Sequence, residues 1–188
     1  MQIIDALSPG DVIIAPPKMQ DKRFSRAVIM LTHQREGYWF GLALNKPSEH
    51  TVNDLGPEMD VHIPENYPLF WGGPVNPQTI WMLHSRDWSC EHTIPINQHW
   101  AMTSNVEMFH CLADGDQPRH HILTFGFCGW GQGQLEGELA GVEPWTVESS
   151  WLTWRKPDTS KILQVDPEEL WRVSCEQSSR QAVNTWLV

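Results

Sequence analysis

Short apolar runs separated by glycine, proline and charged residues fill the first quarter of the chain. One run lies within residues 10–17, and two further runs rich in β-branched and aromatic residues, 27–33 and 38–45, are joined by a four-residue link that contains Gly37. Runs of this length favour strands, and a short link with glycine favours an antiparallel hairpin. The pattern therefore predicts three strands at the start of the chain.

The middle of the chain alternates extended segments with sharp breaks. Residues 51–55 fit one helical turn, and strands are expected at 69–71, 79–84, 92–96 and 100–103. Between the first two of these strands stand Gly72, Gly73, Pro74 and Val75. Adjacent glycines adopt positive φ angles readily and proline then fixes the backbone, so we expect a tight turn that joins 69–71 to 79–84.

Helical signals enter in the second half of the chain. Ser104 can cap a helix over 105–113, a strand is expected at 121–127, and a helix over 132–139 follows the glycine-rich residues 129–133. An extended segment is expected at 145–154, and Asp166 followed by Pro167 marks the start of a last helix that ends near residue 175. Strands interleaved with short helices predict an α+β fold with a mostly antiparallel sheet.

Composition narrows the class of protein. The chain has 188 residues, of which 40% are hydrophobic, and its apolar runs are far shorter than the roughly 20 residues of a membrane helix. The first six residues include Asp5 and lack the basic lead-in of a secretory signal. We therefore expect one domain over residues 1–188, a cytoplasmic location and no contact with a membrane. The 11 tryptophans either fill the core or line a contact surface.

Net charge bears on the choice of partner. The 13 Lys and Arg residues against 23 Asp and Glu residues give a formal net charge of −10. This charge repels nucleic acid, and no helix-turn-helix pattern with a basic recognition helix is present, so direct binding to DNA is not expected. An anion-binding face would lie near residues 18–26, although a solvated loop is the simpler interpretation.

Cysteine and histidine positions give no strong signal for a metal or a cofactor. Cys90, Cys111, Cys128 and Cys175 are scattered along the chain, so reduced thiols are expected. Cys90 stands two positions before His92, which leaves metal binding open, but the two closely spaced ligand pairs of structural zinc sites are missing. We predict no metal and no cofactor.

Glycines and histidines supply two weak chemical signals. Residues 126–133 lie between a predicted strand and a predicted helix, where backbone N–H groups can hold an anion, but Glu136 and Glu138 follow and no Walker lysine is present. His33 or His84, each near a strand end, could form an acid–base pair with Glu136. The alternative interpretation is structural, with glycines that allow sharp turns and histidines that are hydrogen-bonded at strand ends.

Five motifs, in order and spacing, make the chain resemble the AlgH/YqgE family of bacterial proteins. They are His33 and the segments 41–47, 72–75, 83–84 and 129–136. The resemblance spans residues 8–145 and implies an α+β fold whose bent, mostly antiparallel sheet forms a partial barrel flanked by short helices. The family carries a transcriptional-regulator label, and its biochemical function is uncharacterised. The chain departs from the family pattern after Leu139 and in residues 177–188.

The resemblance implies a binding role more than a reaction. We predict a non-catalytic regulatory module that binds a small molecule or a protein partner and is a monomer or weak dimer. A small hydrolase that uses His33 or His84 with Glu136 is the alternative. Because strand ends and turns commonly position binding residues, the predicted binding residues are Asn45, Gly72, Gly73, Pro74, Val75, His84, Gly129, Trp130, Gly131, Gly133, Gln134 and Glu136.

Overall fold

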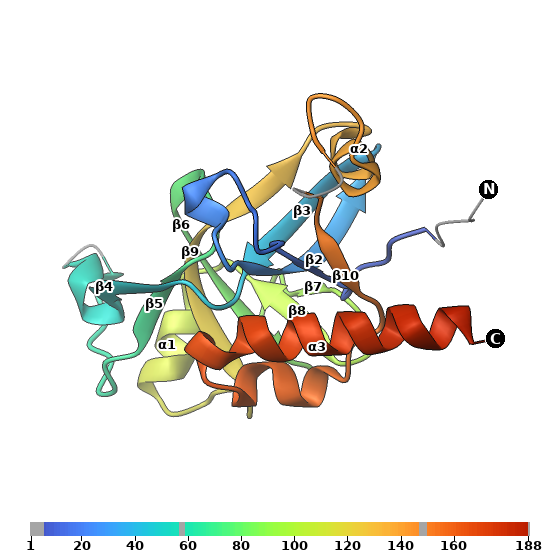
Figure 1. Ribbon diagram of the computed structural model, residues 1–188. Helices are drawn as coiled ribbons and strands as arrows, with labels where there is room; N and C mark the ends of the chain where they lie inside the picture. The colour runs from blue at the N-terminus through green and yellow to red at the C-terminus, as the bar shows by residue number, and fades with distance from the viewer. Residues whose placement is uncertain (1–5, 57–58, 147–149, 188) are drawn as a thin grey trace.

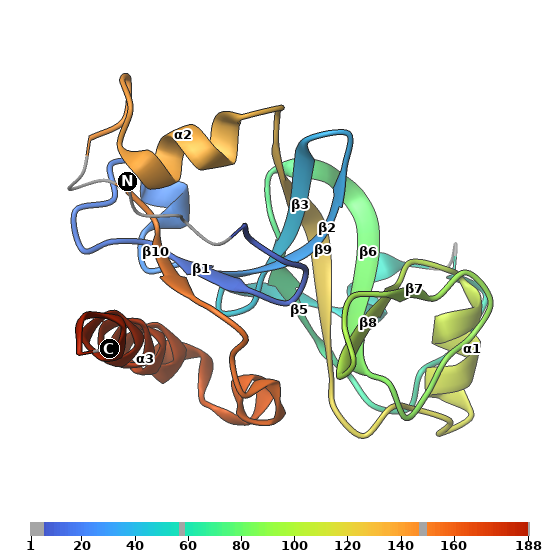
Figure 2. The ribbon, with the colours of Figure 1, turned by 90° about the vertical axis from the view of Figure 1, so that its right-hand side faces the viewer.

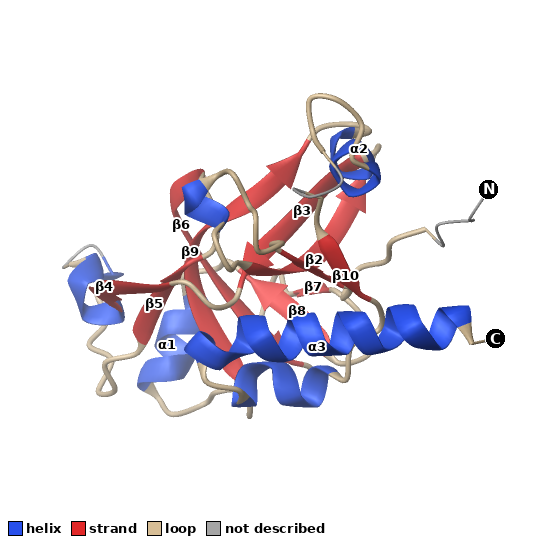
Figure 3. Ribbon diagram, in the orientation of Figure 1, coloured by secondary structure: helices blue, strands red, loops and turns tan. Residues whose placement is uncertain are grey.

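A mostly antiparallel sheet of ten strands forms the centre of the protein (Figure 1). The computed structural model describes residues 6–56, 59–146 and 150–187. In these residues, helices lie around the sheet (Figure 3), which confirms the expected α+β class. The strands are β1 (Val12–Ile14), β2 (Val28–Arg35), β3 (Tyr38–Ala43), β4 (Pro47–Thr51), β5 (Pro68–Trp71), β6 (Val75–Ser85), β7 (Ile94–Pro95), β8 (Trp100–Thr103), β9 (His121–Trp130) and β10 (Leu152–Trp154). The helices are α1 (Glu107–Ala113), α2 (Gln134–Ala140) and α3 (Pro167–Trp186), with 3₁₀ turns at Lys22–Phe24, Val52–Leu55 and Thr159–Gln164.

The sheet is open. Its order is β10-β1-β2-β3-β9-β6-β8-β7, and the two end strands do not pair with each other in the described part of the chain. β5 pairs with β9 in parallel, and β4 pairs with β5. Figure 2 shows α2 and α3 on opposite sides of the β1–β10 end, whereas α1 lies beside β8 at the other end. The result is the bent partial barrel that the family resemblance implied.

The first three strands confirm the prediction from the apolar runs. β1, β2 and β3 are antiparallel neighbours. The hairpin link holds Glu36 and Gly37 at φ angles of 52° and 84°, which gives the tight reversal that two paired strands need. β1 is buried along its whole length because β2 and β10 pair with both of its edges, so its sequence is a continuous apolar run without alternation.

The expected tight turn at residues 72–75 is wrong. β5 and β6 do not pair with each other but lie on opposite sides of β9, where Leu69 and Met82 both pair with Leu123. The segment between them crosses the backbone of β9. A Cβ atom at Gly73 would lie 2.1 Å from the backbone carbon of Phe127, and one at Gly126 would lie 2.2 Å from the carbonyl oxygen of Gly73. The glycines are therefore required by a backbone-to-backbone crossing, and β6 begins at residue 75 and not at 79.

Helices α1 and α2 confirm the expected helices within about two residues, which is the usual uncertainty of helix ends. The last helix differs from the prediction, because α3 runs to Trp186 and not to residue 175. Residues 176–186 contain neither glycine nor proline, so no local signal stops it. Of the segment expected to be extended at 145–154, residues 152–154 form β10 and residues 147–149 lie outside the described residues. No helix in the described part of the chain is long and apolar enough to span a membrane.

Three hydrophobic clusters hold the elements together. One lies between the sheet and α3, a second lies between the sheet and α2, and the third surrounds α1. Alternate residues of β1 face the first two clusters, because successive side chains of a strand point to opposite faces. All tryptophans except Trp145 and Trp186 pack in one of the clusters, so most of them serve the core.

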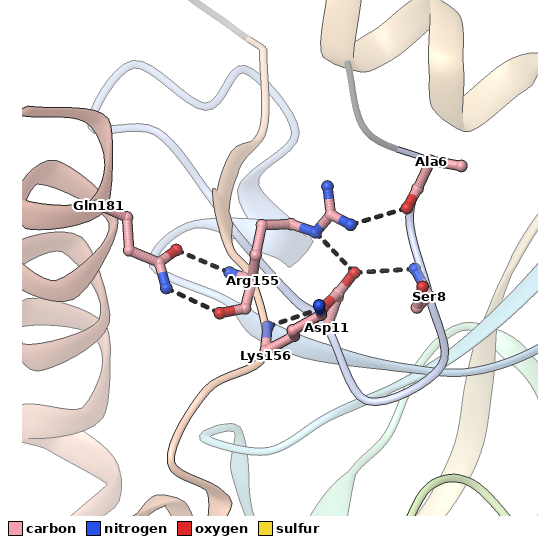
Figure 4. Close-up of polar contacts among 6 residues, drawn as sticks. All are labelled: Ala6, Ser8, Asp11, Arg155, Lys156 and Gln181. Carbon is pink, nitrogen blue, oxygen red and sulfur yellow. Dashed lines mark hydrogen bonds and ion pairs between the residues drawn. The ribbon is translucent and has the colours of Figure 1, made fainter. Parts of the chain in front are cut away.

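A buried aspartate joins the segment before β1 to the segment that follows β10 (Figure 4). The Asp11 carboxylate, whose side chain is 2% exposed, accepts hydrogen bonds from the backbone N–H groups of Ser8 and Lys156. It also accepts a 2.7 Å bond from Nε of Arg155, whose Nη2 donates to the carbonyl of Ala6. Because a buried charge is stable only when paired and hydrogen-bonded, this cluster fixes the position of the chain after β10.

The same segment holds α3 in place. The Gln181 side chain accepts a hydrogen bond from the backbone N–H of Arg155 and donates one to its carbonyl, at 2.8 and 2.7 Å (Figure 4). Trp171, nearer the start of the helix, donates from its indole to the carbonyl of Ala15. These contacts tie both halves of α3 to the β1–β10 end of the sheet.

Candidate functional site

A cavity of about 370 Å³ lies between α2, the end of β9 and the segment that contains the first 3₁₀ turn. Its volume falls in the range of about 300–1,000 Å³ that is typical of small-molecule sites. We call it the α2 cavity; it is lined by Met19, Gln20, Asp21, Arg23, Phe24, Pro74, Cys128, Gly129, Trp130, Gln134, Glu138, Pro144, Trp145 and Trp151.

Aromatic side chains form much of the wall of this cavity. Trp130 ends β9, Trp151 immediately precedes β10, and their rings stand at 81° with centroids 6.4 Å apart. Phe24 meets Trp151 edge-on at 5.8 Å. Trp145 is half-buried and packs beside Gly137 of α2, where an added Cβ atom would lie 3.2 Å from the indole. Three separate segments of chain therefore supply the wall.

Glu138 provides a buried carboxylate in the wall of the cavity, with 9% of the residue exposed. Its Oε2 accepts hydrogen bonds from the indole N–H groups of Trp130 and Trp151, at 3.1 and 2.6 Å. Its Oε1 accepts a 2.9 Å bond from Gln134, one helical turn earlier, and Gln134 in turn accepts from the backbone N–H of Gly131. The carboxylate thus orients both indoles and joins α2 to the sheet.

The mouth of the cavity carries an exposed ion pair. Asp21 accepts hydrogen bonds from the Arg23 side chain, the shortest at 2.7 Å, and from its backbone N–H. These bonds, with the charge of Arg23, lower the pKa of the Asp21 carboxyl. Arg26, by contrast, lies over the Trp171 ring at 5.4 Å, and the Lys46 ammonium donates to the Ser25 carbonyl. Arg23 and Arg26, two cations of the basic segment expected near residues 18–26, therefore already have partners within the protein.

Cys128 lies at the base of the cavity and is not a nucleophile. Its thiol is buried and donates a hydrogen bond to the carbonyl of Gly72 at 3.3 Å. Burial raises the pKa of this thiol to about 12, because the low-polarity surroundings disfavour the thiolate. Since thiolate is the reactive form, Cys128 stays neutral and inert near pH 7. All four cysteines are free thiols, as expected from the sequence.

The structure brings some of the predicted binding residues together at the cavity. Pro74, Gly129, Trp130 and Gln134 line it. Gly131 bonds to Gln134, and Gly133 precedes α2 at a φ of 74°. Val75 begins β6 and is exposed, while Gly72 and Gly73 belong to the crossing over β9.

Two of the predicted residues, Glu136 and Asn45, lie outside the cavity and have partners of their own. Glu136 is exposed, and its Oε1 accepts a 3.1 Å bond from the indole of Trp39. Asn45 is buried; its side chain accepts from the backbone N–H of Val28 and donates to the carbonyl of Arg26, which fixes the start of β2. Its hydrogen-bonding groups are thus used by the backbone.

His84 is fully buried between β8 and β9. Its Nε2 lies 2.9 Å from Oγ1 of Thr103, its Nδ1 lies 3.0 Å from the Ser85 carbonyl, and its ring meets Trp88 edge-on. Burial lowers the pKa of this imidazole, which favours the neutral ring. His84 thus takes part in a hydrogen-bonded network inside the sheet.

The acid–base pair expected for a hydrolase is not formed. His33 stacks on Phe40 at 4.4 Å, and its Nδ1 lies 3.1 Å from the hydroxyl of Thr32. Neither His33 nor His84 has a hydrogen bond or ion pair with Glu136 among the contacts of the described residues. A general base needs such reach to its partner, so the geometry does not supply this mechanism.

The anion-binding loop considered for residues 126–133 does not form. β9 continues through Cys128 and Gly129 to Trp130, where these residues pair with β3. Helix α2 has seven residues and begins with its acidic Glu136 in the first turn. The described residues also contain no group of three or more His, Cys, Asp or Glu side chains placed to hold a metal ion.

Sequence reasoning missed the residues that define the cavity most clearly. Glu138 drew attention only as a charge that opposes an anion, and Trp145 and Trp151 carried no motif. The spacing of Gln134 and Glu138, four residues apart on a helix that follows Trp130, is the signal that could have pointed to a shared hydrogen-bonded cluster. The contribution of Trp151 depends on the fold and has no local signal.

A second, wider groove of about 710 Å³ runs beside α3. Its polar lining includes Arg155, Lys156 and Gln181, which donate hydrogen bonds within the Asp11 cluster and in the contact with α3. The larger volume therefore belongs to a surface whose polar groups already stabilise the fold. The α2 cavity is the better candidate because aromatic walls and a buried carboxylate converge there.

Two related proteins match most of this chain in sequence. A UPF0301 protein of Jannaschia sp. is 36% identical over 151 residues, which cover 77% of this chain and 74% of that protein. A UPF0301 protein of Methylococcus capsulatus is 27% identical over 168 residues, covering 87% and 85% of the two chains.

Two solved structures share the fold of this chain. The solution structure of the AlgH protein from Pseudomonas aeruginosa matches with a TM-score of 0.72 at 25% identity, over 94% of this chain and 90% of the other. A crystal structure from Corynebacterium diphtheriae shares the fold with a TM-score of 0.65 at 22% identity, over 89% and 85% of the chains. A family model described as AlgH-like matches residues 12–182. Because that match covers most of the sequence, this chain belongs to the AlgH-like family.

Proposed function

We propose that this protein is a non-catalytic binding module that holds a small organic molecule in the α2 cavity. The observation that carries the proposal is the convergence of Trp130, Trp145 and Trp151 with the buried Glu138 around a space of about 370 Å³. Apolar and aromatic walls supply contact area for a ligand, and one fixed polar group supplies orientation, which is the usual composition of a small-molecule site.

A binding role fits the chemistry of the lining residues better than catalysis does. Cys128 is neutral, and the acid–base candidates His33 and His84 are held by other residues. Glu138 is fixed by three hydrogen bonds and has no general-acid partner among the described lining residues. These side chains can recognise a molecule, and neither histidine considered as a general base is among the described lining residues.

The proposed role is regulatory and cytoplasmic, through binding of the ligand and without direct contact with DNA. The net charge of −10 supports the second part, because it opposes approach to a polyanion. The transcriptional-regulator label that the family resemblance implies is compatible with an indirect role of this kind.

The test is a fragment screen by NMR on the full chain, with uncharged, cationic and anionic small molecules. Each tryptophan has its own indole N–H resonance, so binding in the cavity should shift those of Trp130 and Trp151, whose N–H groups both meet Glu138. The resonance of Trp186, which is 79% exposed at the end of α3, should not move. No saturable shift at Trp130 or Trp151 with any fragment would overturn the proposal.

A matched pair of variants tests the position of the site. Trp145→Ala removes part of the cavity wall and should weaken fragment binding about ten-fold, the scale of one aromatic contact in a partly buried site. Trp186→Ala removes an indole outside the cavity and should leave affinity unchanged. Equal affinity in the Trp145→Ala and Trp186→Ala variants would place the fragments elsewhere.

A further inference from the structure

Glu138 is a buried carboxylate whose hydrogen-bond partners among the described residues are all neutral. Its contacts are two indole N–H groups and the amide of Gln134, and no salt bridge within 4 Å reaches it from a described residue. Buried carboxylates are ordinarily paired with a cation, because neutral donors return only part of the solvation that burial removes. The wall of the α2 cavity therefore carries a negative charge that the surrounding side chains do not balance.

Arg23 is the one cation among the described lining residues, and it is paired with Asp21. Arg23 lies at the exposed mouth and binds Asp21 through Nε and Nη2, with the shortest contact at 2.7 Å. The described lining thus contains two carboxylates, Asp21 and Glu138, and one guanidinium that is paired with the first of them. The net charge of these described lining residues is negative.

Glu138 also has room for one more donor. A carboxylate oxygen can accept two hydrogen bonds, and Oε2 has both, from Trp130 and Trp151. Among the described residues, Gln134 alone donates to Oε1. A donor that enters the cavity can therefore complete the shell of Oε1 without displacing a protein group.

The walls favour the same kind of donor. Indole rings attract cations more strongly than other aromatic rings do, and desolvated sites strengthen this attraction. Trp130 and Trp151 stand nearly perpendicular, and Trp145 and Phe24 add further aromatic surface. Aromatic rings beside a fixed carboxylate are surroundings in which an ammonium group can exchange part of its hydration for protein contacts.

We infer that the ligand of the α2 cavity is a small organic cation whose ammonium nitrogen sits against Oε1 of Glu138 within the tryptophan walls. This inference rests on the proposed function, because it names the chemical class of the molecule that the cavity binds. Primary, methylated and ring-borne ammonium groups all belong to the class. Carboxylates and phosphates do not, because Glu138 repels them.

The test compares molecules of equal shape and different charge on the wild-type chain. One pair is choline and its neutral carbon isostere, in which a quaternary carbon replaces the nitrogen. One triad is benzylammonium, benzyl alcohol and benzoate. Dissociation constants come from the indole shifts of Trp130 and Trp151, and each cation is expected to bind about ten-fold or more tightly than its neutral counterpart, with the anion weakest.

Variants then assign the preference to one carboxylate. Glu138→Gln keeps the size of the side chain and removes its charge, so the cation and its isostere should bind within about two-fold of each other. Glu107→Gln removes one negative charge from the exposed face of α1 and should keep the full preference. The ranking on the wild-type chain tests the inference without relying on the fold of the Glu138→Gln variant.

The outcomes separate this inference from the proposed function. Neutral or anionic molecules that bind as tightly as cations would overturn the inference and leave the binding function in place. Cations that bind with unchanged preference in Glu138→Gln would also overturn it, because another group would then recognise the charge. A screen in which no molecule of any charge shifts Trp130 or Trp151 would overturn both.

Discussion

Two glutamates on one short helix show how position decides the role of a residue. Glu136 and Glu138 are two positions apart in α2, and each accepts a hydrogen bond from an indole. Glu136 is exposed and holds Trp39, whereas Glu138 faces the cavity and holds Trp130 and Trp151. The sequence shows two similar acidic residues, and only the direction of each side chain from the helix distinguishes a solvated contact from a buried charge.

His84 illustrates the same dependence for a histidine. Its place near the end of a strand suggested chemistry, but the end of β6 is covered on both edges by β8 and β9, so both ring nitrogens meet internal groups. Strand ends supply functional residues when they open onto solvent or a cavity. Whether an end is open depends on strand order, which no local pattern reveals.

Burial of His84 gives a prediction for the pH dependence of stability. The pKa of the imidazole is lowered in the folded state, mainly by burial, from about 6.5 in the unfolded chain. Above pH 6.5 both states hold the neutral ring, and below it only the unfolded chain gains the proton readily, so the free energy of unfolding should fall as the pH drops below 6.5. Urea unfolding at pH 8, 7, 6 and 5 measures this slope.

A His84→Gln variant isolates the contribution of this imidazole. The glutamine does not reproduce the contact between the imidazole and Thr103, so the variant should be less stable at every pH. The decline in its free energy of unfolding between pH 7 and pH 5 should nevertheless be shallower than in the wild-type chain. Comparing slopes removes the constant loss from the comparison. Parallel curves for the two chains would show that His84 does not titrate differently in the folded and unfolded states.

Among the helices and strands, the sequence predicted those whose positions are set by neighbouring residues in the chain. The strands β1 to β3, the 3₁₀ turn at Val52–Leu55 and helices α1 and α2 follow from apolar runs and glycines within a few positions. The cap expected at Ser104 is wrong, because Val106 precedes α1 and makes no side-chain capping hydrogen bond. The relation of β5 to β6 could not be predicted in this way. Glycine, glycine and proline between two strands fit a hairpin turn and a backbone crossing equally, and only the insertion of β9 between the strands decides which one forms.

The length of α3 exceeded the prediction for a related reason. Its second half is polar, with no apolar period to mark it, and is held by contacts with a distant segment. Gln181 satisfies the backbone N–H and carbonyl of Arg155, as a neighbouring strand would. A helix whose final turns depend on such a contact cannot be delimited from its own residues.

This contact predicts the effect of Gln181→Ala. The variant leaves both backbone groups of Arg155 without their partner and should lower the free energy of unfolding by about 1–3 kcal/mol. Hydrogen exchange of the α3 amides after residue 178 should accelerate, while that of the first half, held by Trp171, should not change. Gln177→Ala, one turn earlier on the same helix, is the matched control. Equal hydrogen exchange in Gln181→Ala and Gln177→Ala would show that the Gln181–Arg155 hydrogen bonds do not hold the second half of α3.

The lining of the α2 cavity was only partly predictable because it is assembled from distant parts of the chain. The described lining comes from residues 19–24, from residues 128–130 with Gln134 and Glu138, and from Pro144, Trp145 and Trp151, together with Pro74; the sheet brings these parts of the chain together. Trp130 and Gln134 could be selected because they lie in one compact motif. The hydrogen bond from Trp151 to Glu138 depends on the pairing of β10 with β1. These two strands are far apart in the sequence, so no local pattern reveals their pairing.

β9 connects the two ends of the sheet. It pairs with β3 through residues 128–130, with β5 through residues 123–125 and with β6 through residues 121–127. Since every hydrophobic cluster contains residues packed against this strand, loss of β9 removes support from all of them. We therefore expect the described part of the chain to unfold as one cooperative unit.

Cys128 on β9 reports this cooperativity. Its thiol is buried and its pKa is raised to about 12, so an alkylating reagent at pH 8 reaches thiolate only after β9 separates from its neighbours. In a variant that keeps Cys128 and replaces the other cysteines with serine, the urea dependence of alkylation should follow the unfolding curve from tryptophan fluorescence. A variant that keeps only Cys111, half-buried on α1, should react well before that transition. Alkylation of Cys128 at urea concentrations where fluorescence is still native would show that β9 opens separately, and the two ends of the sheet would then be independent folding units joined by one strand.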